Sequence, residues 1–129
     1  RLIKLVPQTG CDLHTSPCTA TDTSGTIIEL KFPNGLDAAS AVLTEITIQG
    51  ATLESGHLEI QGKTMFMGIN QFPLTPEQGH YRSQIHFPYC TTASMTWLVT
   101  AVLKTSDQRQ FQAEFEFDMA HPKPIKYSP

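Results

Sequence analysis

The sequence is poor in charge: 16% of its 129 residues are charged, and nine Lys and Arg stand against twelve Asp and Glu. A typical soluble domain carries about 25% charged residues. The hydrophobic content of this chain, 40%, is close to that of a typical soluble domain. Disorder and coiled coil are therefore disfavoured. Without a basic excess the chain is not suited to neutralise phosphates, which argues against a nucleic-acid binder. No apolar run approaches the roughly 18 residues of a membrane helix. The length favours one domain with a single core.

The usual sequence signatures of enzymes are also missing. There is no Gly-x-Ser-x-Gly elbow, no glycine-rich phosphate loop and no pair of histidines at helical i, i+4 spacing. Glu114 and Glu116 lie two residues apart on the polar face of a predicted strand, where they serve solubility. Cys90 and His86 resemble a nucleophile and a base, but no third residue is placed to orient the histidine. We therefore expect that the protein is not an enzyme.

What the chain does have is a regular alternation of apolar and polar residues between glycines and prolines. In Phe111–Phe117 every second residue is apolar, which predicts a strand with one wet face. Thr96–Lys104 alternates in the same way but also carries apolar residues on its second face, which predicts a central strand. Further strands are predicted at Leu2–Val6, Thr26–Phe32, Thr44–Gln49, His57–Gln61 and Tyr81–Phe87.

These short strands predict an all-β fold, an antiparallel immunoglobulin-like β-sandwich of about seven strands, with a small closed barrel as the alternative. Trp97 suits the centre of a sandwich core. Hairpin turns are predicted at Thr105–Gln108 and Gly50–Gly56. The sandwich is expected to span residues 1–120 as one domain. Residues 121–129 contain three prolines and predict an extended tail.

The chain has three cysteines, Cys11, Cys18 and Cys90. The short segment between Cys11 and Cys18 contains Ser and Pro, which favour a turn, and predicts a disulfide between them in an oxidising compartment. One rival is a metal hairpin in which both thiols and His14 bind the ion, although the spacing is wider than in a zinc knuckle. The other is pairing with Cys90, or free thiols. Whichever pair forms, one cysteine is left over, and burial is its simplest explanation.

A second group of sulfur atoms is predicted around Met65, Met67, Cys90 and Met95. On a strand, Met65 and Met67 would point to the same face, and loops at one end of a sandwich would bring Cys90 and Met95 near them. Thioethers and a thiolate are ligands that suit Cu(I). The alternatives are that the methionines fill space in the core or belong to a partner-binding patch. Two histidines in the strand before Cys90 are further candidate ligands, namely His80 and His86.

Short motifs spread over most of the chain also point to a family. They are Met65-x-Met67-Gly68-x-Asn70, Leu74, Gly79-x-Tyr81, Pro88-x-Cys90, Met95-x-Trp97 and Phe115-x-Phe117, together with the Cys11…Cys18 opening. With these motifs the sequence resembles a group of uncharacterised proteobacterial proteins, exported or membrane-anchored β-sandwiches similar to FixH-like and YtkA-like modules. The resemblance implies an exported module linked with copper handling or cytochrome oxidase assembly. The sequence departs from periplasmic copper carriers in having no histidine close after Met67.

Two functional hypotheses follow. The first is a non-enzymatic, periplasmic or exported domain that binds Cu(I) as an accessory module. The second is a metal-free module that binds a protein partner through a strand edge or a loop. A thiol oxidoreductase using Cys11 and Cys18 is disfavoured, because the Cys-x-x-Cys spacing is missing. Since the sequence opens on Arg1, a signal peptide or membrane anchor of an exported protein would precede this residue.

Overall fold

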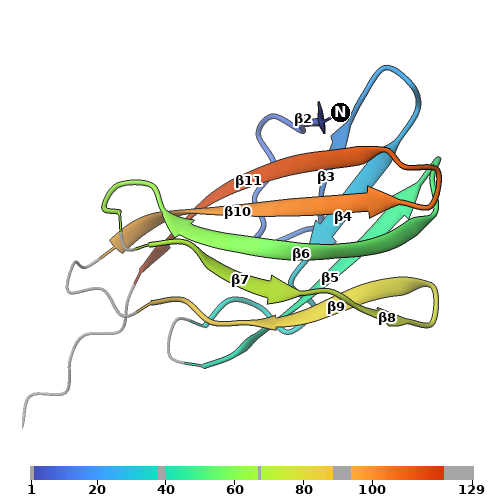
Figure 1. Cartoon of the computed structure of the whole chain (residues 1–129). Helices are drawn as coiled ribbons and strands as arrows, with labels where there is room; N and C mark the ends of the chain where they lie inside the picture. Colours follow the sequence, from blue (N-terminus) through green and yellow to red (C-terminus); the bar gives the residue numbers. More distant parts are fainter. Residues whose placement is uncertain (1, 38–39, 67, 89–93, 121–129) are drawn as a thin grey trace, which may run out of the picture.

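The computed structural model describes residues 2–37, 40–66, 68–88 and 94–120, and the statements below concern these residues. They contain eleven strands and no helix. The strands form two sheets that enclose one apolar core (Figure 1). The predicted all-β sandwich is therefore confirmed.

The first sheet has the strand order β1-β11-β10-β6-β7. Strand β1 pairs parallel to β11, whereas the other neighbours pair antiparallel. Strand β10 is central, as the two-sided apolar pattern predicted. The bounds are β1 Leu2–Lys4, β6 Leu53–Gly62, β7 Asn70–Pro73, β10 Ser94–Thr105 and β11 Gln110–Ala120.

The second sheet has the strand order β2-β3-β4-β5-β9-β8, and all its pairs are antiparallel. In Figure 1, β3, β4 and β5 pass behind the first sheet, and β9 and β8 are drawn below β7. The bounds are β2 Val6–Pro7, β3 Cys18–Thr21, β4 Ile27–Lys31, β5 Val42–Gln49, β8 Thr75–Glu77 and β9 His80–Ile85.

The connectivity is that of an immunoglobulin-like sandwich. The order β4-β5-β9-β8 matches the A-B-E-D sheet of that fold, and β6-β10-β11 matches its C-F-G sheet. Strand β7 extends the sheet that matches C-F-G, and β1, β2 and β3 are additions at the start of the chain. These four strands account for the excess over the predicted seven; β1, β2 and β7 are edge strands, and β3 lies between β2 and β4.

The core follows from the two-residue period of the strands. The apolar residues of β10 and β11 that alternate with polar ones are all buried, from Trp97 to Leu103 and from Phe111 to Phe117. Trp97 is fully buried against Phe87, with ring centroids 5.1 Å apart. The large aromatic side chain thus lies inside the sandwich, as the sequence predicted.

Two local predictions were wrong. Gly50–Gly56 is not a hairpin turn, because β5 and β6 belong to different sheets and β6 already begins at Leu53. Leu2–Val6 is not one strand, because the chain crosses at Leu5 from β1 in the first sheet to β2 in the second. The Thr105–Gln108 turn is confirmed, since it joins the antiparallel pair β10 and β11.

The sandwich has two ends, which are named here by what they contain. The turn end carries the β3–β4, β5–β6, β8–β9 and β10–β11 connections. The loop end carries the β2–β3, β4–β5 and β6–β7 connections and the end of β11. In Figure 1 the β10–β11 connection lies on the right and the β6–β7 connection on the left.

Candidate functional site

The most unusual surface of the molecule is the β6–β7 loop, residues 63–69, at the loop end. Met65 is 44% exposed, Phe66 73% and Ile69 52%. The described residues include two other exposed large apolar side chains, Leu2 and Val6, and both lie in the short N-terminal strands. Three large apolar side chains on one loop therefore form the largest local group of this kind that the structure describes. We call Met65, Phe66 and Ile69 the apolar loop tip.

Contacts at the base of this loop hold it against strand β10. The Thr64 hydroxyl donates a hydrogen bond to Met95 Sδ at 2.7 Å, and the Lys63 N–H donates to the Thr96 carbonyl at 2.8 Å. A Cβ on Gly62 would clash with the Met65 carbonyl oxygen and would lie 3.4 Å from Met95 Sδ. The chain approaches so closely here that only glycine fits without a shift. The exposed tip therefore projects from a tightly packed base.

A surface ion pair links the loop to the outer face of β11. Lys63 Nζ lies 2.7 Å from Glu116 Oε2, and both side chains are about half exposed. Asp118, two residues further along β11, accepts a hydrogen bond from the Thr96 hydroxyl at 2.6 Å. Glu114 is exposed on the same face. On the outer face of β11 beside the loop, these residues therefore comprise three carboxylates and one lysine, which leaves an excess of negative charge among them.

The structure revises the predicted sulfur site in two places. Met65 lies in the β6–β7 loop and not on a strand, because β6 ends at Gly62. Met95 lies in β10 and not in the preceding loop; it is 2% exposed, and its sulfur already accepts the Thr64 hydrogen bond. Met67 and Cys90 lie outside the described residues. A common point for the four sulfur atoms thus stays a prediction.

The two candidate histidines contact other residues among those that the structure describes. His80 Nε2 lies 3.2 Å from Glu45 Oε2 on the outer face of the second sheet. His86 is exposed, as predicted, and its ring centroid is 6.0 Å from that of Phe72. Among the residues that the structure describes, no group of three or more His, Cys, Asp or Glu side chains is arranged to hold a metal ion.

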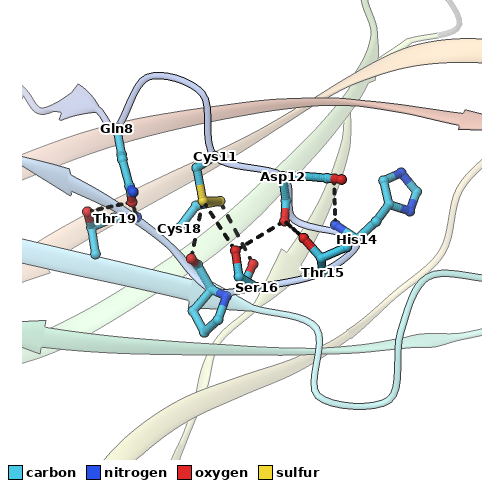
Figure 2. Close-up of a disulfide and its surroundings, with 9 residues drawn as sticks. Gln8, Cys11, Asp12, His14, Thr15, Ser16, Cys18 and Thr19 are labelled. Atoms are coloured by element: carbon cyan, nitrogen blue, oxygen red, sulfur yellow. Dashed lines mark hydrogen bonds between the residues drawn. A yellow bond between two sulfur atoms is a disulfide. The ribbon is translucent and has the colours of Figure 1, made fainter.

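The predicted cysteine pair is present at the same end of the sandwich. The Sγ atoms of Cys11 and Cys18 are 2.01 Å apart and their Cα atoms 5.8 Å apart, within the usual range for a disulfide. The Asp12 carbonyl accepts hydrogen bonds from the Thr15 and Ser16 N–H groups, which form the turn between the two cysteines. The hydroxyls of Thr15 and Ser16 also donate to this carbonyl (Figure 2). The sequence prediction of this disulfide agrees with the structure.

The segment closed by the disulfide covers one end of the core. Leu13 is buried as part of the core, and His14 Nε2 donates to the Asp118 carbonyl at 2.5 Å. The rival metal hairpin is therefore not the arrangement seen: the two sulfur atoms bond to each other, and His14 points away from them to β11 (Figure 2). The segment Cys11–Cys18 therefore has a structural role, and we call it the disulfide clasp.

Comparison with known proteins returns no match, since no family model, no curated protein and no solved structure is significantly similar to the chain. The resemblance to FixH-like and YtkA-like modules accordingly stays a prediction. The structure contains no helix, within the described residues, that is long and apolar enough to cross a bilayer.

Sequence reasoning missed Phe66 and Ile69 as candidate functional residues. It considered only the two methionines of the segment, Met65 and Met67, and placed them on a strand. A signal was present in the sequence, because glycines at 62 and 68 bracket the segment; in the structure Gly68 adopts φ +83°. Glycines that bracket a segment indicate a loop. Large apolar side chains in a loop are candidates for function, because they are not needed to fill the core.

Proposed function

We propose that the protein is a non-enzymatic binding module that docks the apolar loop tip, Met65, Phe66 and Ile69, into an apolar pocket of a protein partner. The 73% exposure of Phe66 carries this proposal. Exposed apolar patches on otherwise ordinary surfaces mark sites of association. An aromatic side chain inserted in a pocket is also the common centre of binding energy at an interface. The hydrogen bond from Thr64 to Met95 supports it, because a preorganised base reduces the entropy lost on binding.

The charges beside the tip indicate the chemistry of the partner. Glu114, Glu116 and Asp118 follow one another on the outer face of β11, and Lys63 neutralises one of them. A pocket bordered by Lys or Arg would complement this face and increase the association rate. An anionic membrane surface would be repelled by the same carboxylates. The proposed occupant is therefore a protein with an apolar pocket and a basic rim.

The protein is further proposed to act outside the cytoplasm, in the periplasm or after export. The Cys11–Cys18 disulfide geometry supports this location, because disulfides persist in oxidising compartments. Membrane anchoring through a segment before Arg1 belongs to the same proposal and rests on the sequence resemblance alone.

A photo-reactive phenylalanine analogue at position 66 tests the docking proposal. In cells we expect one cross-linked protein species at position 66 and none at position 6, the matched control, since Val6 is 67% exposed on β2. The captured protein is then purified. Phe66→Ala should weaken its binding at least about tenfold, and Glu114→Lys or higher salt should slow its association. Binding that is unaffected by Phe66→Ala, by Glu114→Lys and by higher salt would contradict the proposal.

Cu(I) binding is the second candidate function. Met65 favours this function for two reasons. Its side chain is 44% exposed. Its carbonyl oxygen and Met95 Sδ both lie close to Gly62. The reduced protein is titrated with Cu(I) against a competing chromophoric chelator, and the Met65→Ala, Met67→Ala double variant is titrated alongside. Tight one-to-one binding that is lost in the double variant would make a copper accessory module the working function. Absence of binding would leave the docking proposal.

A further inference from the structure

We infer that Met65 is a site of oxidation to methionine sulfoxide by peroxides, and that this modification weakens docking of the apolar loop tip. The first half stands on the structure of this chain alone. The second half rests on the proposed function, because it concerns the regulation of the same surface.

The described methionines differ sharply in access to solvent. Met65 is 44% exposed, whereas Met95 is 2% and Met119 4% exposed. A peroxide must bring its oxygen to the sulfur lone pair, so exposure governs which methionine reacts in a folded protein. The structure therefore directs the oxidant to Met65 and protects the other two.

Met95 provides an internal comparison within the same contact cluster. Its sulfur accepts the 2.7 Å hydrogen bond from the Thr64 hydroxyl, which occupies a lone pair. Its side chain also packs beside Gly62 at the base of the loop. The two methionines thus meet opposite conditions: the Met95 sulfur is buried and hydrogen-bonded, whereas the Met65 side chain is 44% exposed.

The reaction balances without any further group from the protein. The Met65 sulfur lone pair attacks one oxygen of hydrogen peroxide, and the O–O bond breaks. The sulfur gains an oxygen and is oxidised, while the other oxygen leaves as hydroxide. Hydroxide takes up the proton released from the transferred oxygen and becomes water.

The product changes the character of the tip. A sulfoxide is polar and accepts hydrogen bonds, so it resists transfer from water into an apolar pocket. It would lie directly beside Phe66, the most exposed large apolar side chain described at this end of the sandwich. The core is spared, because the modified side chain is outside it, and we expect the fold to stay intact.

Peptide mapping by mass spectrometry tests the first half. The folded protein is treated with hydrogen peroxide, and fragment ions report positions 65, 67, 95 and 119 separately. Met65 sulfoxide should form at least about tenfold faster than sulfoxide at Met95 or Met119. In urea the described methionines should react at similar rates. Equal rates at Met65 and Met95 in the folded protein would overturn the inference.

Binding of the partner captured through position 66 tests the second half. Oxidised wild type should bind several-fold more weakly than reduced wild type, and methionine sulfoxide reductase should restore binding. Met65→Leu should bind equally before and after peroxide, and Met119→Leu, the matched control at a buried methionine, should respond as wild type does. Equal binding by oxidised and reduced wild type would refute the regulatory half. If position 66 captures no partner, the proposed function fails and the mapping still decides the modification.

Discussion

The two ends of the sandwich close its core in different ways. At the turn end, tight connections bond to one another through the backbone: the Ser106 N–H donates to the Thr52 carbonyl at 2.9 Å, and Gly50 packs against Gly25. At the loop end, a disulfide and a cluster of aromatic rings around Phe117 close the core.

The difference lies in what each end leaves at its surface. The exposed apolar tip occurs at the loop end, where the disulfide and the His14 hydrogen bond also hold the Cys11–Cys18 segment in place. Short backbone-bonded turns have little length in which to present large side chains, whereas a longer loop on a fixed base can do so. A tightly packed base that carries an exposed apolar tip therefore distinguishes the loop end from the turn end.

Phe117→Ala should have the largest effect on stability, a loss of about 3–5 kcal/mol in the free energy of unfolding. The Phe117 ring lies 5.5 Å from that of Phe32 and 5.9 Å from that of Phe87, so truncation leaves a cavity at the loop end. Urea denaturation measures the change. Phe66→Ala, at the same end, should alter stability by less than about 0.5 kcal/mol. A large loss from Phe66→Ala would place the tip in the core and not at a binding surface.

Removing the disulfide with Cys11→Ala, Cys18→Ala should reduce the free energy of unfolding by about 2–3 kcal/mol. The bond closes a short loop, with a sequence separation of 7, and so restricts the unfolded chain only modestly. Thermal unfolding in non-reducing buffer measures the loss. His14→Ala keeps the disulfide and should lose only about 1 kcal/mol. An unchanged midpoint in the double variant would show that the clasp does not stabilise this end.

Gly50→Ala should cost about 2 kcal/mol at the turn end. Gly50 has φ +88°, and an added Cβ would lie 2.7 Å from the Gly25 carbonyl oxygen, which is backbone and has little freedom to move. Gly25→Ala is the matched control, because it has φ +92° but nothing within 4 Å of its Cβ. It should lose only about 1 kcal/mol, from the left-handed conformation alone. Equal losses in urea denaturation would mean that the close approach of the two turns is unimportant.

The smallest effect is expected from Asp107 in the β10–β11 turn. The side-chain hydrogen bonds from Arg109 and then from Thr105 lower the pKa of Asp107 below 3.8. A lowered folded-state pKa adds stability above the unfolded pKa, and this contribution is lost as the pH falls through the folded value. The melting temperature of wild type should therefore slightly exceed that of Asp107→Asn at neutral pH, and the difference should vanish in acid. A difference that grows in acid would reverse the assigned sign.

Much of the fold was predictable because the evidence for it is local. The period of two in Phe111–Phe117 and the apolar faces of Thr96–Lys104 need no knowledge of distant residues. Strand β3 was missed, because Cys18–Thr21 has little apolar content and becomes a strand through pairing with β4. The change of sheet after Gly50 was missed as well, since turn residues alone do not state which sheet the next strand joins.

The candidate site was predictable only in part, for a similar reason. The Cys11–Cys18 pair follows from spacing within one short segment. The Thr64–Met95 hydrogen bond joins residues 31 positions apart, and no pattern near either residue announces it. Met95, which was predicted in a loop as a metal ligand, is a buried hydrogen-bond acceptor in β10. Met65, which was predicted on a strand, lies exposed in the β6–β7 loop.

The sequence by itself determined that this chain is a β-sandwich with Trp97 inside and an N-terminal disulfide, because strand alternation and short-range cysteine spacing act between close neighbours. Only the tertiary structure decided that the apolar segment after Gly62 projects from one end of the molecule. The physical reason is that exposure depends on which distant strands cover a residue. Here β10 fastens the base of the loop through Met95 and Thr96, and no described element covers its tip.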